Sequence, residues 1–447
     1  MANRRSIAIP FLVAITGVLG YAVFRSGGVV RPDRYVYLLA LGLLTLVHSL
    51  CVSTAGRAPA LDRRLSWPVL LLFCYVAFQL LPLPLSWMRV ISPARAELLE
   101  ALAPVVPGIH SAPLSVDPAG TLTHLLLVAG YTVLFYLVRE ITWHSRDRLW
   151  LPAFPLVLIA ALEGALGLVQ YAGGDPENAH GTYAKRNHYV ALLEMALPFA
   201  VMYAIAILRR DPRRSRSSAG PAMKACLGLA GAALILLGVI YSLSRMGFLA
   251  SLLSLFVIGA LTVGWGLASR HKWLALASVA IVMLLSVVFL PPAQLIQRFG
   301  RLASEDRLQV WGETLHLVSA YPVFGCGLGA YESAFPRYKV SAPLEAWDHA
   351  HNDYLQLLAE LGLAGSLIAA ALLLVVLSRL IRVLTNHPEP DARYLAIACT
   401  GALAGFLAHS ITDFNLYIPA NAMVLAWILG LSVGLDFSPS LRSERPG

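Results

Sequence analysis

Residues 354–378 read YLQLLAELGLAGSLIAAALLLVVLS and contain one charged side chain, Glu360. A helix needs about 20 mostly apolar residues to cross the hydrocarbon core of a bilayer, so this stretch predicts a membrane-spanning helix. The polar residues 348–353, DHAHND, precede it directly. The number of similar apolar runs elsewhere in the chain decides the fold class.

Twelve runs of this kind occur, separated by Pro, Gly and charged residues. They lie near residues 7–24, 35–53, 67–85, 121–139, 149–171, 188–208, 224–243, 246–268, 273–290, 354–378, 394–411 and 419–436. The first resembles a signal sequence, but no small-residue cleavage site follows it, so we expect it to be retained. The sequence predicts an all-α integral membrane protein with about 12 transmembrane helices, a single polytopic domain over residues 1–447.

The composition excludes a soluble globule. Of the 447 residues, 58% are hydrophobic and 13% are charged, whereas about a quarter are charged in an ordinary soluble domain. A soluble protein of this size needs a polar coat that so few charges cannot supply. The apolar blocks have no Gly-X-Y or heptad period, which excludes collagen and coiled coils. Five scattered cysteines indicate no disulfide framework.

Lys and Arg set the predicted orientation, because positive residues near helix ends stay in the cytoplasm. With both termini cytoplasmic, 21 of the 34 basic residues fall in inside segments and 13 outside, five of these in one long loop. The largest inside group is Arg209, Arg210, Arg213, Arg214, Arg216 and Lys224. No aromatic residues interleave with it, so we expect a topology determinant beside anionic lipid and no nucleic-acid partner.

Residues 291–350 form a large predicted outer loop between the ninth and tenth spans, too long to be a mere connection. Within it, Leu308, Trp311, Leu315 and Val318 recur at helical spacing and predict a helix over 304–318. Arg307 and Trp311 are four residues apart and share a face of that helix. A second short segment carries Tyr331.

Three polar clusters stand at the predicted outer ends of spans. They read GTYAKRNH at 181–188, SLSRMG at 242–247 and DHAHND at 348–353, and each leads into a helix that runs inward. Each of these helices turns its unpaired N–H groups and partial positive charge outward. We expect a pyrophosphate-sized anion to be bound there by four basic residues: Lys185, Arg186, Arg245 and Arg307.

Each of these basic residues also has a structural interpretation. Lys185 and Arg186 could extend to lipid head groups, and Arg307 could be an ordinary surface charge on an amphipathic helix. Arg245 is different, because a short turn between two apolar helices needs no arginine and an outward positive charge opposes the topology rule. Arg245 therefore indicates function more than the other three do.

His351 is the predicted general base, because imidazole exchanges protons near neutral pH. Histidines at helix ends also act as caps, and His349 with His351, Asp348 and Asp353 could chelate a metal. Their spacing matches no zinc signature, so we expect no metal and no cofactor. Auxiliary roles are predicted for Asn187, His188, Trp311, Tyr331, His349, Asn352 and Asp413.

Two carboxylates, Glu163 and Glu194, lie within predicted spans. Buried ionisable residues often mark transport pathways, which keeps a twelve-span transporter or flippase as an alternative. Both carboxylates, however, fall in the outer halves of their helices, where they can support the outer site. A transporter also predicts inverted repeats and charges at the membrane midplane, whereas these polar groups gather at the outer ends.

The predicted chemistry follows from the location. Outside a bacterial inner membrane there is no ATP or nucleotide sugar, and the sequence has no Walker loop or Asp-x-Asp motif. A lipid pyrophosphate-linked sugar brings its own activation, because its diphosphate is both a leaving group and an anion that arginines bind. The arginines would neutralise the leaving diphosphate while His351 deprotonates the attacking acceptor hydroxyl, which inverts the anomeric carbon.

Four motifs together resemble the O-antigen ligase and O-antigen polymerase superfamily. His351-Asn352, nine residues, Gly362, two residues and Gly365 match its His-Asn-x9-Gly-x-x-Gly pattern. The Ser-Leu-Ser-Arg-x-Gly hairpin at 242–247, the Arg-x-x-x-Trp at 307–311 and the Gly-Thr-Tyr-x-x-Arg-Asn-His segment at 181–188 also correspond. The resemblance covers about residues 175–435.

The resemblance implies a metal-independent glycosyltransferase of the bacterial inner membrane that uses undecaprenyl pyrophosphate-linked glycans. It implies that His351 is the catalytic base and that Arg245 contacts the diphosphate. Many relatives have Asn where this chain has Lys185, so the role of Lys185 stays open.

The acceptor distinguishes the members of this superfamily. Ligases transfer to lipid A-core in lipopolysaccharide biosynthesis, polymerases extend another lipid-linked repeat unit, and related oligosaccharyltransferases modify protein. The His-Asn-x9-Gly pattern favours a ligase, with an exopolysaccharide or O-antigen polymerase as the alternative and a protein O-oligosaccharyltransferase behind both.

Overall fold

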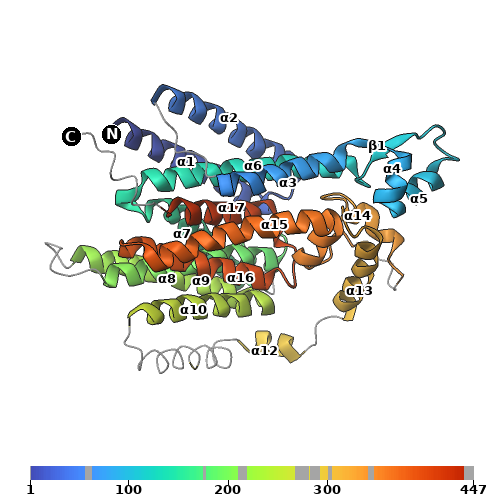
Figure 1. Ribbon diagram of the computed structural model, residues 1–447. Coiled ribbons are helices and arrows are strands. Elements are labelled where there is room, and N and C mark those ends of the chain that lie inside the picture. The colour runs from blue at the N-terminus through green and yellow to red at the C-terminus, as the bar shows by residue number, and fades with distance from the viewer. Residues whose placement is uncertain are drawn as a thin grey trace.

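The computed structural model describes residues 2–55, 63–174, 178–209, 219–266, 281, 292–300, 305–340 and 347–436. Long helices lie side by side in a bundle (Figure 1). They are α1 (Ala2–Phe24), α2 (Arg31–Ala55), α3 (Arg63–Leu80), α6 (Pro118–His144), α7 (Phe154–Ala172), α8 (Arg186–Leu208), α9 (Ala219–Tyr241), α10 (Arg245–Gly266), α15 (Asp353–Asn386), α16 (Pro390–His409) and α17 (Pro419–Gly434).

Short elements gather mainly at one end of the bundle. They are η1 (Ser26–Gly28), β1 (Pro82–Pro84), α4 (Leu85–Ile91), α5 (Pro93–Leu102), β2 (Ser111–Pro113), η2 (Arg146–Arg148), η3 (Leu151–Ala153), α12 (Ala293–Gly300), α13 (Glu305–Ala320), α14 (Tyr331–Ala334), η5 (Phe335–Arg337) and η6 (Asn415–Tyr417). We call the end that carries α4, α5, α13 and α14 the loop end (right in Figure 1), and the opposite end, where α1 begins, the terminal end.

Seven helices in the described part of the chain are long and apolar enough to cross a membrane. They are Arg31–Cys51, Pro118–His144, Leu151–Ala172, Arg186–Leu208, Gly220–Tyr241, Arg245–Gly264 and Asp353–Asn386. The prediction of an all-α membrane protein is confirmed at this level. Eleven of the twelve predicted spans overlap a helix, and the remaining one, 273–290, lies outside the described residues except for residue 281. The count of twelve therefore stays a prediction.

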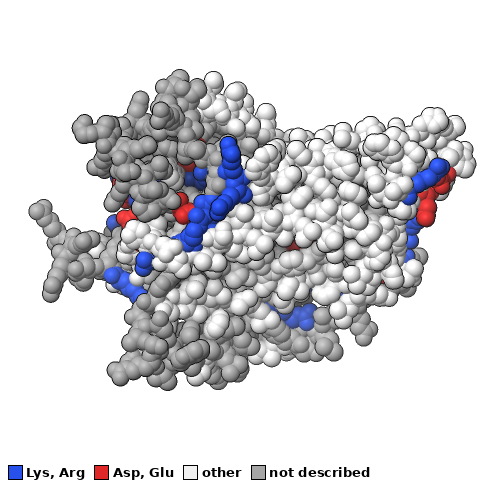
Figure 2. All heavy atoms as spheres, in the orientation of Figure 1, with Lys and Arg blue, Asp and Glu red and all other residues white. Residues whose placement is uncertain are grey.

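The distribution of charge on the surface agrees with a membrane location. On the face shown in Figure 2, a broad band between the two ends of the bundle is almost free of charged side chains, and Lys and Arg gather towards the terminal end. Large apolar side chains are exposed within the helices, as along α2 at Leu39, Leu43, Leu46 and Leu50. Exposed apolar surface on this scale fits lipid as the surrounding solvent.

Helix α8 is the centre of the bundle. Its sequence is apolar around the whole circumference, a pattern typical of a helix buried on all sides, and 83% of its most apolar stretch is buried, against 11% for α2. It packs on α7, α9, α10, α16 and α17. The first residues of α8, which carry one of the polar clusters, are thereby held at a fixed place at the loop end.

The third predicted span, 67–85, was too long. Helix α3 ends at Leu80, and residues 82–84 instead form strand β1, antiparallel to β2 with Leu83 opposite Ala112. The physical reason is the sequence Pro82-Leu83-Pro84, because proline excludes a continuing helix and pushes the preceding residue to extended backbone. A two-stranded ribbon and two short helices therefore stand at the loop end, where the sequence predicted only a connection.

Helix α15 is interrupted at Gly362, which has φ +60° and ψ −172°. At this break the segment 322–327 runs beside α15: Leu363 N donates to Pro322 O at 2.9 Å, and Cys326 N donates to Ala359 O at 2.9 Å. A Cβ at Gly362 would overlap the carbonyl oxygen of Val323. The first glycine of the His-Asn-x9-Gly-x-x-Gly pattern thus lets the outer loop dock on α15.

The second glycine of that pattern, Gly365, lies against the ring of Tyr75 from α3. The Tyr75 hydroxyl donates to Phe324 O at 3.0 Å and to Leu361 O at 2.5 Å. The neighbouring Gln79 amide donates to the same Phe324 oxygen and to Glu360 O. Carbonyls freed by the break in α15 are therefore satisfied by side chains of α3, as a membrane environment requires.

We predict that Gly362→Ala destabilises the fold. The backbone conformation is one that essentially only glycine adopts, which costs other residues about 1–3 kcal/mol, and the overlap with Val323 adds to this. The thermal unfolding midpoint in detergent should fall, while Gly264→Ala, where an added Cβ meets no atom within 4 Å, should leave it unchanged or slightly higher. Equal midpoints for both variants would contradict the docking role of Gly362.

Candidate active site

The residues before α15 form a turn that fixes the position of His351. His351 has φ +50°, an uncommon conformation for a residue other than glycine. Asn352 is the N-cap, and its Oδ1 accepts from Tyr354 N at 3.0 Å and Leu355 N at 3.1 Å. The predicted auxiliary residue Asn352 therefore has a local role, because its side-chain oxygen satisfies the first amides of the helix.

Asp353 ties this turn to residues 410–416, between α16 and α17. Its carboxylate accepts from Ser410 Oγ at 2.8 Å and from Leu416 N at 3.3 Å, and its amide donates to Ser410 O at 2.9 Å. Asp353 is 1% exposed. The turn that carries His351 and the segment that carries Asp413 are thus one rigid unit.

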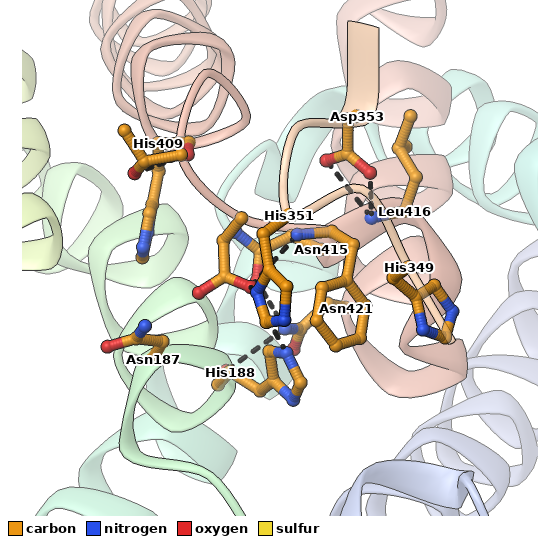
Figure 3. A network of polar contacts seen from close by, with 12 residues as sticks. Asn187, His188, His349, His351, Asp353, His409, Asn415, Leu416 and Asn421 are labelled. Atoms are coloured by element: carbon orange, nitrogen blue, oxygen red, sulfur yellow. Dashed lines mark hydrogen bonds and ion pairs between the residues drawn. The ribbon is translucent and has the colours of Figure 1, made fainter. Parts of the chain in front are cut away.

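Asp413 faces two histidines, one in the turn before α15 and one in the first turn of α8. Its Oδ1 lies 3.7 Å from Nδ1 of His351 and 3.4 Å from Nε2 of His188, the first-turn histidine of α8. Both nitrogens are buried, and neither has a shorter hydrogen bond within the described part of the chain. Figure 3 shows His188 and His351 close together at this point. Nδ1 of His351 is therefore directed at a carboxylate, which leaves Nε2 as the ring nitrogen for a substrate.

The pKa of Asp413 lies well below its usual range. Burial of the carboxyl raises its pKa. The imidazoles of His188 and His351, which face the carboxyl, and the nearby His409 lower the pKa by more than burial raises it. The Phe414 amide also donates to Oδ1 at 2.9 Å. Asp413 is thus a carboxylate that can orient the His351 ring and stabilise its protonated form, the role of the acid in catalytic triads.

The Phe414 ring is the common contact of the charged and imidazole groups. His349 stacks on it with centroids 4.0 Å apart, and His188 and His351 each meet it edge-on at 4.7 Å. The Lys185 Nζ lies 5.0 Å from the same ring centroid, within range of a cation–π interaction. Sequence reasoning did not identify Phe414, since a lone phenylalanine in an apolar chain carries no signal.

Helices α8 and α10 begin side by side, with Arg186 as the first residue of one and Arg245 as the first residue of the other. The Ser244 hydroxyl donates to Asn187 Oδ1 at 2.9 Å and joins the two starts. Gly247 follows in the hairpin because a Cβ there would overlap the Val190 side chain of α8. Two helix N-termini and two arginines are thus brought to one place, an arrangement suited to an anion.

The side chains of Arg307 and Trp311 hold α13 against the loops of the site. Nη1 of Arg307 donates to Thr412 O at 2.9 Å, next to Asp413, and Nε1 of Trp311 donates to Ala350 O at 3.0 Å, next to His351. The other predicted residue of this loop, Tyr331, is 1% exposed, and its hydroxyl lies 2.7 Å from that of Thr314. Arg307 therefore lies beside the segment that carries Asp413, and one of its nitrogens donates to the backbone there.

Three buried carboxylates connect the elements that surround the site. Glu194 of α8 pairs with Nδ1 of His409 in α16 at 3.0 Å, and both are fully buried. Glu163 of α7 accepts from the Thr182 hydroxyl at 2.6 Å and from the Thr182 amide at 3.0 Å. Glu360 of α15 accepts from the Tyr417 hydroxyl at 2.6 Å and from Gly329 N at 2.7 Å. Glu194 thus joins two helices, and Glu163 and Glu360 each join a helix to a loop.

The structure brings most of the predicted site residues to one region of the loop end, around Phe414 and Asp413. Asp348 pairs with His349 at 3.3 Å, and that histidine lowers the pKa of Asp348 despite its partial burial. No group of three or more His, Cys, Asp or Glu residues arranged to hold a metal ion occurs among the described residues. Arg31, Arg34, Phe414 and Tyr417 also face this region, and the sequence analysis did not predict them.

The fold and the site together define a polytopic membrane protein with a histidine–carboxylate pair and clustered arginines at one end of its helices. Residues 230–370 match the protein family described as O-antigen ligase, which confirms the predicted O-antigen ligase and polymerase superfamily for this region. No curated protein was found to match the chain. The matched region contains Arg245, Arg307 and His351, whereas His188, in α8, and Asp413, between α16 and α17, lie outside it.

Acidification should affect Asp413→Asn and the wild type differently. Because the folded pKa of Asp413 is depressed, the carboxylate stabilises the fold above its unfolded pKa of about 3.9, and this contribution is lost as the pH falls through the lower folded value. The wild-type unfolding midpoint should therefore fall more steeply between about pH 5 and 3 than that of Asp413→Asn.

The control for this experiment is Glu332→Gln, which removes an exposed carboxylate near the site. Its unfolding midpoint should follow the wild-type curve over the same pH range. Parallel curves for Asp413→Asn and the wild type would show that the two histidines do not stabilise the Asp413 carboxylate.

Proposed function

We propose that the chain is an O-antigen ligase-like glycosyltransferase that moves a glycan from undecaprenyl pyrophosphate to an acceptor hydroxyl, with lipid A-core as the acceptor. The observation that carries this proposal is the His351–Asp413 pair, held at the start of α15 beside the starts of α8 and α10. The superfamily supports glycosyl transfer from a lipid-linked glycan in general terms.

The proposed reaction is a direct displacement at the anomeric carbon. Nε2 of His351 takes the proton of the acceptor hydroxyl as its oxygen forms the new glycosidic bond. The bond from the anomeric carbon to the diphosphate oxygen breaks, and the electron pair leaves with undecaprenyl pyrophosphate. Asp413 keeps the His351 ring in the required orientation and stabilises the imidazolium. One displacement inverts the anomeric configuration.

The leaving diphosphate is assigned to Arg186, Arg245 and Arg307, with Lys185 as a fourth cation. Negative charge grows on the bridging oxygen as the bond breaks, and cations already in place stabilise that charge without reorganisation. The N-termini of α8 and α10 add partial positive charge in the same direction. The donor carries the activated linkage, these groups stabilise its leaving diphosphate, and the proposed reaction uses no metal.

The proposed location is the bacterial inner membrane, with the loop end in the periplasm and both termini in the cytoplasm. The excess of basic residues in the segments that would then be cytoplasmic supports this orientation. A periplasmic site also explains why the donor must carry its own activated linkage. The residues 291–350 would form a periplasmic loop over the active site.

The acceptor separates the proposed ligase from a polymerase or a protein glycosylating enzyme. Purified protein in liposomes, supplied with an undecaprenyl pyrophosphate-linked glycan, would be offered lipid A-core, a second lipid-linked repeat unit or an unfolded protein in separate reactions. We expect lipid A-core to be extended. Extension of the repeat unit would make the enzyme a polymerase, and transport of the glycan without transfer would make it a flippase.

His351→Ala should lower turnover by about 10²- to 10⁴-fold, the usual contribution of a general base. The variant is measured under saturating donor and acceptor, after its unfolding midpoint is shown to equal that of the wild type. His316→Ala, which removes an exposed histidine of α13, is the matched control and should keep full activity. Wild-type turnover in His351→Ala would rule out His351 as the base.

Arg245→Lys should reduce turnover by about 10- to 100-fold, because an ammonium keeps the charge but loses the two-pronged contact that a guanidinium makes with a phosphate. The loss should appear in kcat more than in KM if Arg245 acts on charge that develops at bond breaking. Arg63→Lys, at the exposed start of α3, serves as the control. An unchanged kcat would reduce Arg245 to an interfacial residue.

A further inference from the structure

A polar cavity of about 610 Å³ lies at the loop end, beside Phe414. Its walls come from the starts of α2 and α6, from the segments 183–188, 329–332 and 348–349, and from α15. Charged residues of both signs line it: Arg31, Arg34, Lys185, Asp117, Glu332, Asp348 and Glu360. The volume is within the range of ordinary small-ligand sites, about 300–1,000 Å³.

The chemistry of this cavity suits a sugar better than a diphosphate. Carboxylates and cationic side chains both line the cavity. The carboxylates would accept hydrogen bonds from sugar hydroxyl groups, and the cations would donate hydrogen bonds to them. Tyr35 and Phe414 add ring surfaces. Nε of Arg34 is buried and has no hydrogen bond within the described residues, so a donor is available to a ligand. A site for a diphosphate alone would not carry the carboxylates of Asp117 and Glu332.

An apolar groove of about 250 Å³ continues from the polar cavity. The two share His124 of α6 and Tyr417 as lining residues. The groove lies between α3, α6, α15 and α17, and its walls include Leu72, Ala369 and Leu372. Several of these side chains are half-buried, which indicates that the groove is open along its side. A polar cavity joined to an apolar groove in the span of the helices matches an amphipathic ligand, with sugars in one part and hydrocarbon in the other.

The three arginines proposed for the diphosphate lie on a different flank of the site. Arg186, Arg245 and Arg307 do not line the polar cavity or the apolar groove, whereas Lys185, the fourth proposed cation, lines the polar cavity. They stand at α8, α10 and α13, and α10 packs on α8 and α16, whereas the groove is bounded by α3, α6 and α15. Residues 410–417, which carry Asp413 and Phe414, run from α16 to α17, and Phe414 and Tyr417 line the polar cavity.

We infer that the polar cavity and the α3–α6–α15–α17 groove bind the acceptor, as a saccharide anchored on a lipid chain, on a flank of the site away from Arg186, Arg245 and Arg307. This inference rests on the proposed function and adds to it the place and the chemical class of the second substrate. The acceptor sugar occupies the polar cavity, and its hydrocarbon lies in the groove. Donor and acceptor then approach the His351–Asp413 pair from two sides without sharing a lipid pathway.

Ala369→Trp tests the inference, because the side chain of Ala369 lines the groove. Ala370→Trp is the matched control, since Ala370 is the next residue of α15, is exposed and does not line the groove. Steady-state transfer in detergent is measured with donor and acceptor varied in turn, lipid A-core being the acceptor, or a second lipid-linked repeat unit if the wild type extends that instead. Ala369→Trp should raise the acceptor KM by at least about tenfold and leave the donor KM unchanged.

A second measurement is independent of turnover and of the tolerance of tryptophan. A photo-crosslinking benzoyl-phenylalanine is placed at position 369 and, as control, at position 370, in full-length protein that also carries His351→Ala. Illumination with lipid A-core, or with the repeat unit, should label position 369 much more than position 370. Lipid A-core stripped of its acyl chains should compete weakly with the intact molecule.

Three outcomes would overturn the inference. They are a rise in donor KM without a rise in acceptor KM, equal effects of the two tryptophan variants, and equal crosslinking at the two positions. These outcomes leave the proposed function standing, because the wild type still transfers. Loss of the proposed function shows itself differently, as absence of transfer by the wild type to every acceptor while crosslinking at position 369 still reports a bound amphipathic saccharide.

Discussion

The structure depends on the partnering of buried carboxylates at the loop end. A charge inside a membrane protein is costly unless it is paired or hydrogen-bonded, and three buried carboxylates here each take a partner from a distant part of the chain. Asp353 joins α15 to the segment after α16, Glu194 joins α8 to His409, and Glu360 joins α15 to the outer loop. If the helix ends met differently, each of these carboxylates would be buried without its partner. The contacts therefore specify how the helix ends meet.

These contacts have a direct consequence for the site. His351 lies in an uncommon backbone conformation directly before two anchored residues, Asn352 and Asp353, and its orienting partner Asp413 lies on the segment that Asp353 holds. General-base catalysis requires such a group to stay in reach of its proton during the reaction. A membrane enzyme cannot obtain this rigidity from a hydrophobic effect between helices, because the surrounding lipid is equally apolar. Polar contacts at the helix ends supply it instead.

Much of the site was predictable because polar residues are rare in this chain. His351, Arg245 and Arg186 stand out against apolar surroundings, and the sequence analysis selected each from its place at the end of a span. The role of Asp413 as the partner of His351 was not predictable, since 62 positions separate the two residues and the pairing depends on Asp353. Phe414, Arg31 and Arg34 were missed for the same reason. Arg31 lies at the start of a helix whose lipid-facing pattern gives no hint of a cavity, and Phe414 is one phenylalanine among 16.

The sequence by itself determined the membrane class, the order and approximate limits of the helices, and the helix ends at which polar groups collect. Hydrophobicity and length decide these features locally, because each span must bury its own backbone groups in lipid. Only the tertiary structure decided which helix ends meet, that α15 breaks at Gly362 to receive the outer loop, and that a polar cavity continues into an apolar groove. These features arise from contacts between residues far apart in the chain, and such contacts leave no local periodicity in the sequence.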